Sequence, residues 1–190
     1  MRRSGMQDHS TEPSDGAIVA RVRAGDRDAY RILVRRYQDG LYRHALRMTS
    51  HADTAADLVQ GALVKAYTHI HRCRDPERFG AWLFRILANR CKDHLKSRRR
   101  KDVSLEADHV PPARSTEDPE LDTERLELRT LLQAAIERLP DIQREAFLLK
   151  HVEGRSYEEI SEMLDVSVPA LKMRVLRARE ALKAELEEVL

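Results

Sequence analysis

Apolar residues recur at helical spacing along most of this chain, and no segment shows a period-two run of β-branched residues. Because a spacing near 3.6 residues marks one side of a helix and a period of two marks a strand, the pattern predicts an all-α protein. Asp15, Asp26 and Ser156 stand where helix-capping side chains are expected. The expected helices cover about residues 15–25, 26–48, 53–71, 79–98, 122–139, 141–154, 156–164 and 167–189.

A polar segment that contains three prolines divides these helices into two groups. Residues 101–121 are poor in apolar residues and change from basic to acidic along their length, so we expect a flexible linker. The chain is therefore predicted to form two small helical domains. The predicted segments are a disordered leader (1–14), an N-terminal helical bundle (15–100), the linker (101–121) and a C-terminal helix-turn-helix bundle (122–190).

Residues 156–179 carry the pattern of a helix-turn-helix. Ser156 and Glu159 match a capping box, residues 165–167 interrupt the apolar stripe, and Pro169 falls in the first turn of the next helix. That helix has one apolar side and one basic side, which suits a DNA major groove. An ordinary helical hairpin with a solvated basic face is the alternative. The candidate DNA contacts are Ser167, Lys172, Met173, Arg174, Arg177 and Arg179.

The two halves of the chain carry opposite charge. Residues 1–100 contain 21 Lys and Arg against 11 Asp and Glu, whereas residues 101–190 contain 13 against 21. The first half is therefore expected to be the stronger binder of polyanions.

The helix expected over residues 79–98 combines an indole ring with cations and an amide. Bases can stack on such a ring while the cations follow the phosphates, which is what single-stranded DNA requires. The alternative is that Trp82 belongs to the core and that the cations are solvated. The candidate strand contacts on this helix are Trp82, Arg85, Asn89, Lys92 and Lys96.

The helix expected over residues 53–71 has a second face that is partly apolar. Asp57, Gln60, Gly61 and Val64 lie opposite its predicted buried side, to which Leu58 belongs. A valine beside an acid and an amide is consistent with a docking patch, although scattered apolar residues are common on protein surfaces.

Catalytic chemistry, metal binding and membrane insertion find little support in the sequence. No apolar run approaches the roughly 18 residues that a membrane span needs, and the N-terminus lacks the apolar core of a signal peptide. His69, His71 and Cys73 form the only metal-like cluster, but residues two apart diverge around a helix. We find no phosphate-binding glycine loop and no nucleophile–base pairing. We therefore predict no catalytic residue, no metal and no cofactor.

The two cysteines, Cys73 and Cys91, offer no disulfide framework, which fits a reducing cytoplasm. We expect buried, inert thiols.

Specific strings resemble a known family. DTAADLVQ (residues 53–60) and AWLFRILAN (81–89) resemble the second conserved region of bacterial sigma factors. Leu139-Pro140, SYEEI (156–160) and LKMRVLRAR (171–179) resemble their fourth region. A short chain with only these two regions resembles the extracytoplasmic-function (ECF) group of the sigma-70 family, over roughly residues 15–98 and 122–185.

This resemblance implies a sigma factor and not an enzyme. Such a protein binds core RNA polymerase, directs it to specific promoters and opens the −10 region; its expected location is the cytoplasm, with the nucleoid. The resemblance implies contacts with the beta-prime clamp helices and the beta flap, a linker that runs toward the RNA path, and regulation by an anti-sigma factor. The docking residues would be Asp57, Leu58, Gln60, Gly61 and Val64.

The resemblance also assigns the DNA contacts. The loop at residues 73–78, with Arg74 and Arg78, and the face of the following helix would bind the unpaired non-template strand of the −10 element. One base there would be flipped into a pocket. The last helix would contact the −35 element as duplex.

Four residues, at three places in the chain, depart from the family pattern. Gly61 replaces a usual acid, which removes a charge and loosens the helix. Cys73 replaces a common aromatic residue, so the pocket for a flipped base is expected to differ. Pro169-Ala170 replaces a usual Gly-Thr and removes a hydroxyl that could contact phosphate.

Two other functions fit parts of the sequence. A stand-alone helix-turn-helix regulator would bind palindromic duplex as a dimer, but the chain shows no obvious dimer zipper. A metal-dependent enzyme would use the histidine–cysteine cluster and would purify with stoichiometric metal.

Overall fold

The structure, a computed structural model, describes residues 12–102 and 123–189. Within these two ranges the elements are helices and connecting turns, which confirms the all-α prediction. Most of the predicted leader and linker lie outside the described residues. The N-terminal domain contains α1 (Asp15–Arg23), η1 (Arg27–Ala29), α2 (Tyr30–Thr49), α3 (Ala52–Thr68), η2 (Ile70–Arg72), η3 (Pro76–Arg78) and α4 (Phe79–Asp102). The C-terminal domain contains α5 (Thr123–Arg138), α6 (Asp141–Phe147), the π-helical turn η4 (Leu148–Val152), α7 (Tyr157–Leu164) and α8 (Val168–Val189).

The N-terminal domain is built on α2, α3 and α4, which pack against one another. The buried side of α3 is the predicted one, and three of its members are alanines, at positions 55, 62 and 66. Small side chains let neighbouring helices approach closely. The helix predicted to reach residue 71 ends at Thr68, where the chain tightens into η2.

An aromatic cluster surrounds the start of α4. Phe79 is fully buried, and its ring centroid lies 6.5 Å from that of Tyr30, 6.0 Å from that of Tyr37 and 5.8 Å from that of Trp82. The Tyr30 hydroxyl donates to the carbonyl of Leu63 at 2.7 Å, which ties α2 to α3. The cluster therefore joins three helices at the end of the domain where Trp82 lies.

The cap of α1 differs from the prediction. Ser14, not Asp15, accepts a hydrogen bond from the N–H of Ala17, at 3.2 Å. Asp15 is buried instead, where Arg36 pairs with it at 2.5 Å and the Tyr37 hydroxyl donates to it. Burial and this carboxylate both raise the pKa of Tyr37. Asp15 thus joins α1 to α2, a tertiary role that capping statistics cannot reveal.

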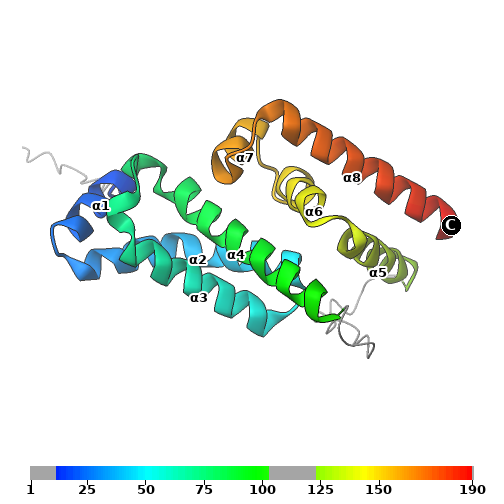
Figure 1. The fold of residues 1–190 in the computed structure, drawn as a ribbon, viewed down its shortest axis with the longest axis horizontal. Coiled ribbons are helices and arrows are strands. Elements are labelled where there is room, and N and C mark those ends of the chain that lie inside the picture. Colours follow the sequence, from blue (N-terminus) through cyan, green and yellow to red (C-terminus); the bar gives the residue numbers. More distant parts are fainter. Residues whose placement is uncertain (1–11, 103–122, 190) are drawn as a thin grey trace, which may run out of the picture.

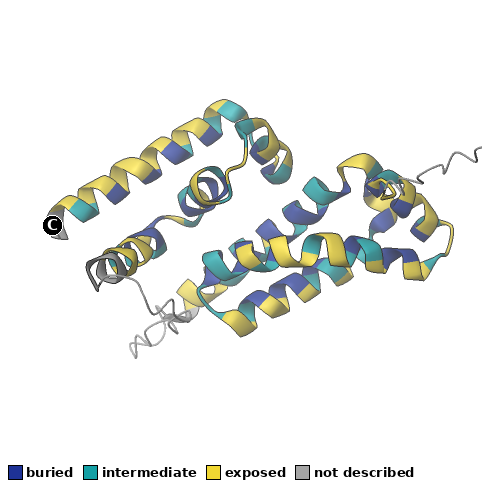
Figure 2. Cartoon of the chain, turned by 180° about the vertical axis from the view of Figure 1, so that it is seen from behind, coloured by how far each residue is buried: buried dark blue, intermediate teal, exposed yellow. Residues whose placement is uncertain are grey.

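In the C-terminal domain, the helix-turn-helix forms as predicted. The Ser156 hydroxyl accepts from the N–H of Glu159 at 3.1 Å, and the Glu159 carboxylate accepts from the N–H of Ser156 at 2.8 Å. Asp165 ends α7 in the left-handed conformation, with φ of 59°. Figure 2 shows α8 with buried positions along one side and exposed positions along the other. The buried positions include Leu171, Val175, Ala178 and Leu182, which form the predicted apolar side.

The apolar stripe of α5 is only partly buried. Ala135 and Ile136 lie in the core, but Leu128 and Leu132 are 48% and 38% exposed. Helical periodicity identified this stripe but did not show that Leu128 and Leu132 are exposed. Ile142 on α6 is exposed as well.

The two domains touch, with α4 lying between the α2–α3 pair and the helices α6 and α7 (Figure 1). Buried apolar residues of both domains form one continuous cluster. Arg144 of α6 is buried and donates to the carbonyl of Met48 at 2.9 Å and to that of Glu137 at 2.8 Å. The flexible linker predicted from the sequence gave no reason to expect such a contact.

Candidate nucleic-acid interface

One face of α4 carries the residues that the sequence assigns to single-stranded DNA. Asn89 and Lys96 are exposed, whereas Trp82, Arg85 and Lys92 are half-buried. Their spacing of three and four residues places them along the same side of the helix. The structure therefore brings the five predicted α4 contacts together on one surface.

Trp82 packs against the core but also remains partly exposed, so it has features of both the core residue and the base-stacking residue considered above. Its ring packs on Phe79 and against the core, but the side chain is not fully buried. A ring held on one side by the core and accessible on the other is a suitable platform for stacking a base. Packing against Phe79 restricts the ring, so less conformational entropy is lost when a base stacks.

Two cations of this face, Arg85 and Lys92, contact the C-terminal domain. Arg85 donates to the carbonyl of Glu162 at 2.9 Å and pairs with Asp165 at 3.2 Å. Lys92 pairs with Glu145 at 3.0 Å. Glu145 is fully buried. Within the part of the chain that the structure describes, the two carboxylate oxygens of Glu145 accept no hydrogen bond, and Lys92 is their ion-pair partner. Burial raises the pKa of Glu145, while Lys92 opposes that rise.

The loop before α4 is fixed from inside. The Arg23 guanidinium donates to the carbonyls of Ile70 and Cys73, at 2.9 and 2.5 Å, which shapes the turn that leads to Arg74. Arg74 and Arg78 are both exposed. Sequence reasoning missed Arg23, although it stands in the last turn of α1, where a cation also interacts favourably with the helix dipole.

The exposed side of α8 carries the predicted duplex contacts. Lys172, Met173, Arg177 and Arg179 are exposed and Arg174 is half-buried. Ser167 is exposed immediately before the helix, and its carbonyl accepts from the N–H of Leu171 at 3.0 Å. The predicted set is therefore available on one surface of the helix-turn-helix.

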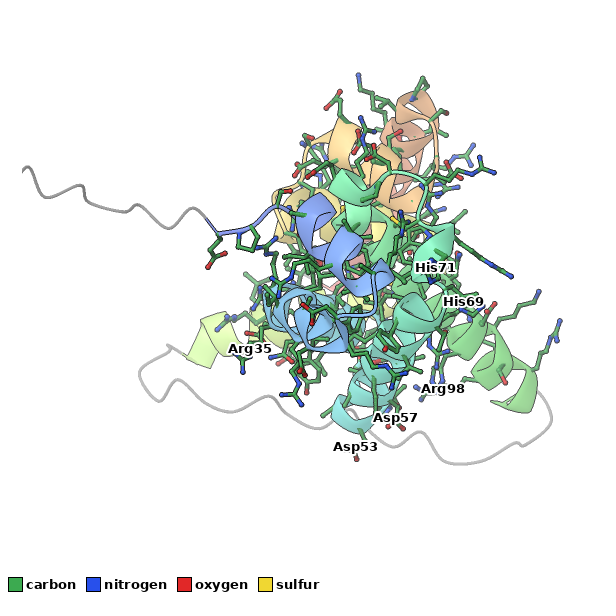
Figure 3. All side chains as sticks on the ribbon, turned by 90° about the vertical axis from the view of Figure 1, so that its left-hand side faces the viewer. Arg35, Asp53, Asp57, His69, His71 and Arg98 are labelled. Carbon is green, nitrogen blue, oxygen red and sulfur yellow. The ribbon has the colours of Figure 1, made fainter. Side chains whose placement is uncertain are left out.

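The proposed docking face lies on α3. Asp57, Gln60 and Val64 are exposed, and Val64 is 56% exposed. Figure 3 shows Asp53 and Asp57, which are about one helical turn apart, on α3 at the edge of the domain. Leu58 is only 7% exposed and belongs to the core, so it supports this face from inside and does not contribute contact surface.

Gly61 has a structural role that the sequence did not suggest. A Cβ atom at this position would collide with the guanidinium of Arg90, which reaches across from α4. The guanidinium of Arg90 therefore occupies the space beside Gly61. Any side chain at position 61 would displace the end of Arg90.

The thiols are buried, as expected. Burial raises the pKa of Cys91 to about 12 and also raises the pKa of Cys73. The Cys73 thiol donates to the carbonyl of Asp75, at 3.3 Å. A thiol that stays protonated at neutral pH is a poor nucleophile.

His69 and His71 follow α3 and lie on the periphery of the domain (Figure 3). The Nδ1 atom of His69 lies 2.9 Å from the Thr68 hydroxyl and 3.0 Å from the carbonyl of Lys65. Across the residues that the structure describes, no group of three His, Cys, Asp or Glu side chains is placed to hold a metal ion. Nor does any helix within residues 12–102 and 123–189 have the length and apolar character of a membrane span.

Comparison with protein families matches both domains. The family profile described as Sigma-70 region 2 matches residues 33–101, and the profile described as Sigma-70, region 4 matches residues 129–182. The RNA polymerase sigma-H factor of Pseudomonas aeruginosa is 34% identical, over 95% of this chain and 97% of that protein. The ECF RNA polymerase sigma-E factor of Escherichia coli K12 is 32% identical, over 95% of this chain and 98% of that protein.

Two solved structures are also similar. The sigma factor RpoE of Bartonella quintana, crystallised with the anti-sigma factor NepR, matches with a TM-score of 0.65 and 26% identity, over 83% of this chain and 96% of that one. CnrH, solved in complex with the cytosolic domain of CnrY, matches with a TM-score of 0.66 and 27% identity, over 93% of this chain and 99% of that one.

Proposed function

Because the chain belongs to the sigma-70 family, as a member of its extracytoplasmic-function group, we propose that the exposed face of α4 captures the unpaired non-template strand of the −10 element. As a sigma factor, the chain binds core RNA polymerase and directs it to promoters. The opening step needs no covalent chemistry by this chain. We therefore propose that the chain acts as an initiation factor and is not itself an enzyme.

The arrangement of Trp82 with Arg85, Asn89 and Lys92 carries this proposal. Extruding a base from the duplex costs a few kcal/mol, and stacking on an aromatic ring returns about 1–3 kcal/mol per base. Cations along the same helix side add a salt-dependent attraction for the strand phosphates. Binding energy that is available only to the unpaired strand shifts the promoter toward its open form.

We propose that α3 docks on the clamp helices of the beta-prime subunit through Asp57, Gln60, Gly61 and Val64, and that the C-terminal domain contacts the beta flap. Val64 supports this proposal because a large apolar side chain that is more than half exposed gains most from being covered by a partner.

Val64→Asp is expected to weaken the binding of core RNA polymerase about tenfold or more, because a desolvated carboxylate replaces an apolar contact. Fluorescence anisotropy of the labelled chain, titrated with core polymerase, measures this change. Gln38→Asp is the control, since it adds the same carboxylate at an exposed position of α2, in the same domain but outside the proposed docking face. Equal affinities of the two variants would remove α3 from the docking surface.

The exposed side of α8 is proposed to contact the −35 duplex. Lys172→Ala and Arg177→Ala are each expected to reduce run-off transcription about tenfold from promoters that need the −35 contact, since one such contact contributes about 1–3 kcal/mol. Lys183→Ala, three turns further along α8, removes a cation outside the proposed contact and serves as the control. Unchanged initiation by the Lys172 and Arg177 variants would contradict the assignment.

We also propose that an anti-sigma factor binds this chain, and that the chain works in the cytoplasm with the nucleoid, where its polymerase and promoters are found. The similar structures support the first point, since both were solved with another protein bound, and the protein bound to the Bartonella quintana sigma factor is the anti-sigma factor NepR.

A further inference from the structure

The proposed strand-binding face of α4 is also the surface on which the C-terminal domain lies. Arg78, just before α4, and then Arg85, Lys92 and Arg99 follow one another at intervals of seven residues. Seven residues are close to two helical turns, so these cations form a row along one side of the helix. Three of the four are proposed contacts of the −10 strand. We call these four residues the cation row.

Each member of the cation row meets a carboxylate of the C-terminal domain. The acids come from the first residue and middle of α6, from α7 and from the turn after α7. The pairs are Arg78–Glu162 (2.8 Å), Arg85–Asp165 (3.2 Å), Lys92–Glu145 (3.0 Å) and Arg99–Asp141. Carboxylates in contact with these cations supply negatively charged oxygen acceptors, as the phosphates of a nucleic-acid strand would.

In three further contacts between the domains, the acid again comes from the C-terminal domain. Glu153 lies 2.8 Å from the ring of the buried His44 and 3.6 Å from Arg47. The Ser50 hydroxyl donates to Glu137 at 2.6 Å. In each case the acid belongs to the C-terminal domain. The excess of acid in residues 101–190 therefore has a partner within the same chain, in the basic surface of residues 1–100.

We propose that, in the chain free of polymerase, the C-terminal domain covers the strand-binding face of α4, with Glu145, Glu162 and Asp165 holding the cations that the promoter strand later takes. This inference rests on the proposed function, in which that face binds the −10 strand. The acids and the strand compete for the same side chains, so the free chain would bind single-stranded DNA poorly until the domains separate.

The physical chemistry of these contacts favours a reversible cover. The Arg78–Glu162 and Arg85–Asp165 pairs are largely exposed, and exposed ion pairs add little to stability. Glu145 is fully buried with Lys92 as its ion-pair partner, so the desolvation of its carboxylate offsets much of their attraction. These ion pairs can therefore be exchanged for contacts with strand phosphates at little cost in electrostatic energy.

A reversible lock tests this inference on the full chain. Ser50→Cys and Glu137→Cys place thiols at the ends of a direct contact that lies outside the cation row. A cleavable bismaleimide joins them, while the native Cys73 and Cys91 are buried and react poorly. Anisotropy of a fluorescein-labelled single-stranded oligonucleotide of random sequence is measured before and after cleavage of the linker with reductant. We expect cleavage to tighten binding about tenfold, as the competent fraction rises.

A second variant opens the cover without a cross-link. Glu145→Gln, Glu162→Gln and Asp165→Asn together remove the three acids and keep side-chain size. The control removes the same number of charges elsewhere in the C-terminal domain, through Glu158→Gln, Glu180→Gln and Glu187→Gln. We expect only the first set to tighten strand binding beyond that of the native chain. Equal effects of the two sets, or a locked chain that binds the oligonucleotide as well as the cleaved one, would overturn the proposal.

The same measurements separate this inference from the proposed function. Adding Trp82→Ala to the three-acid variant is expected to remove most of the gained affinity. If strand binding depends on Trp82 but does not respond to the lock, the cover is wrong and the α4 face stands. If binding responds to the lock but does not depend on Trp82, the C-terminal domain covers a different nucleic-acid surface, and both the inference and the assignment of α4 fail.

Discussion

Trp82→Ala is expected to reduce the fraction of open promoter about tenfold or more while leaving the affinity for duplex promoter DNA unchanged. The reason is that the indole ring is proposed to stack only on an unpaired base, so its loss removes about 1–3 kcal/mol from the open form alone. Permanganate reactivity of thymines in the −10 region measures opening in the reconstituted holoenzyme, and a competition assay on the same promoter measures duplex affinity.

Two controls separate stacking from packing at this position. Trp82→Tyr keeps an aromatic ring that can stack, so it should retain most of the opening activity. Urea unfolding of the alanine variant, followed by circular dichroism, should show a domain that is still folded under assay conditions. Equal losses of opening and of duplex affinity would contradict the assignment of Trp82 to the unpaired strand.

Phe79→Ala is expected to destabilise the N-terminal domain by about 3–5 kcal/mol, the cost of removing a fully buried phenylalanine side chain. Phe79 is 0% exposed and contacts the rings of Tyr30, Tyr37 and Trp82, so its loss leaves a cavity at the junction of α2 and α4. Urea unfolding can be followed by the fluorescence of Trp82, the only tryptophan in the chain, which reports on this domain.

Phe79→Leu provides the control for this prediction. It keeps most of the apolar volume, so its cost should be clearly smaller than that of the alanine variant. A loss below about 1 kcal/mol for Phe79→Ala would mean that the neighbouring rings collapse into the cavity and that the cluster does not hold Trp82 in place.

Helical periodicity was sufficient to predict the elements and much of the core, because each helix of this chain buries a stripe that local spacing reveals. The buried sides of α3 and α8 and the capping box at Ser156 follow from residues within a few turns of one another. Periodicity could not show that Leu128 and Leu132 are exposed, since it identifies an apolar stripe but not whether another element covers it.

The contact between the domains could not be predicted in this way. Arg144 and Glu145 are charged residues in a short helix, and their pattern alone suggests a solvated face, yet both are buried. Their partners, Met48 and Lys92, lie 96 and 53 residues earlier in the sequence. The charge difference between the two halves can be counted in the sequence. That the acids of one domain contact the cations of the other could be seen only in the structure.

Site-specific photo-crosslinking tests the central claim most directly. The photoreactive residue p-benzoylphenylalanine replaces Asn89, an exposed position of the α4 face, and the holoenzyme is irradiated on a promoter that it transcribes. The same probe at Met173 on α8 reports on the −35 contact. We predict a cross-link from position 89 to the non-template strand of the −10 element, and one from position 173 to the −35 duplex. Cross-links from position 89 only to paired DNA outside the −10 element would contradict the account.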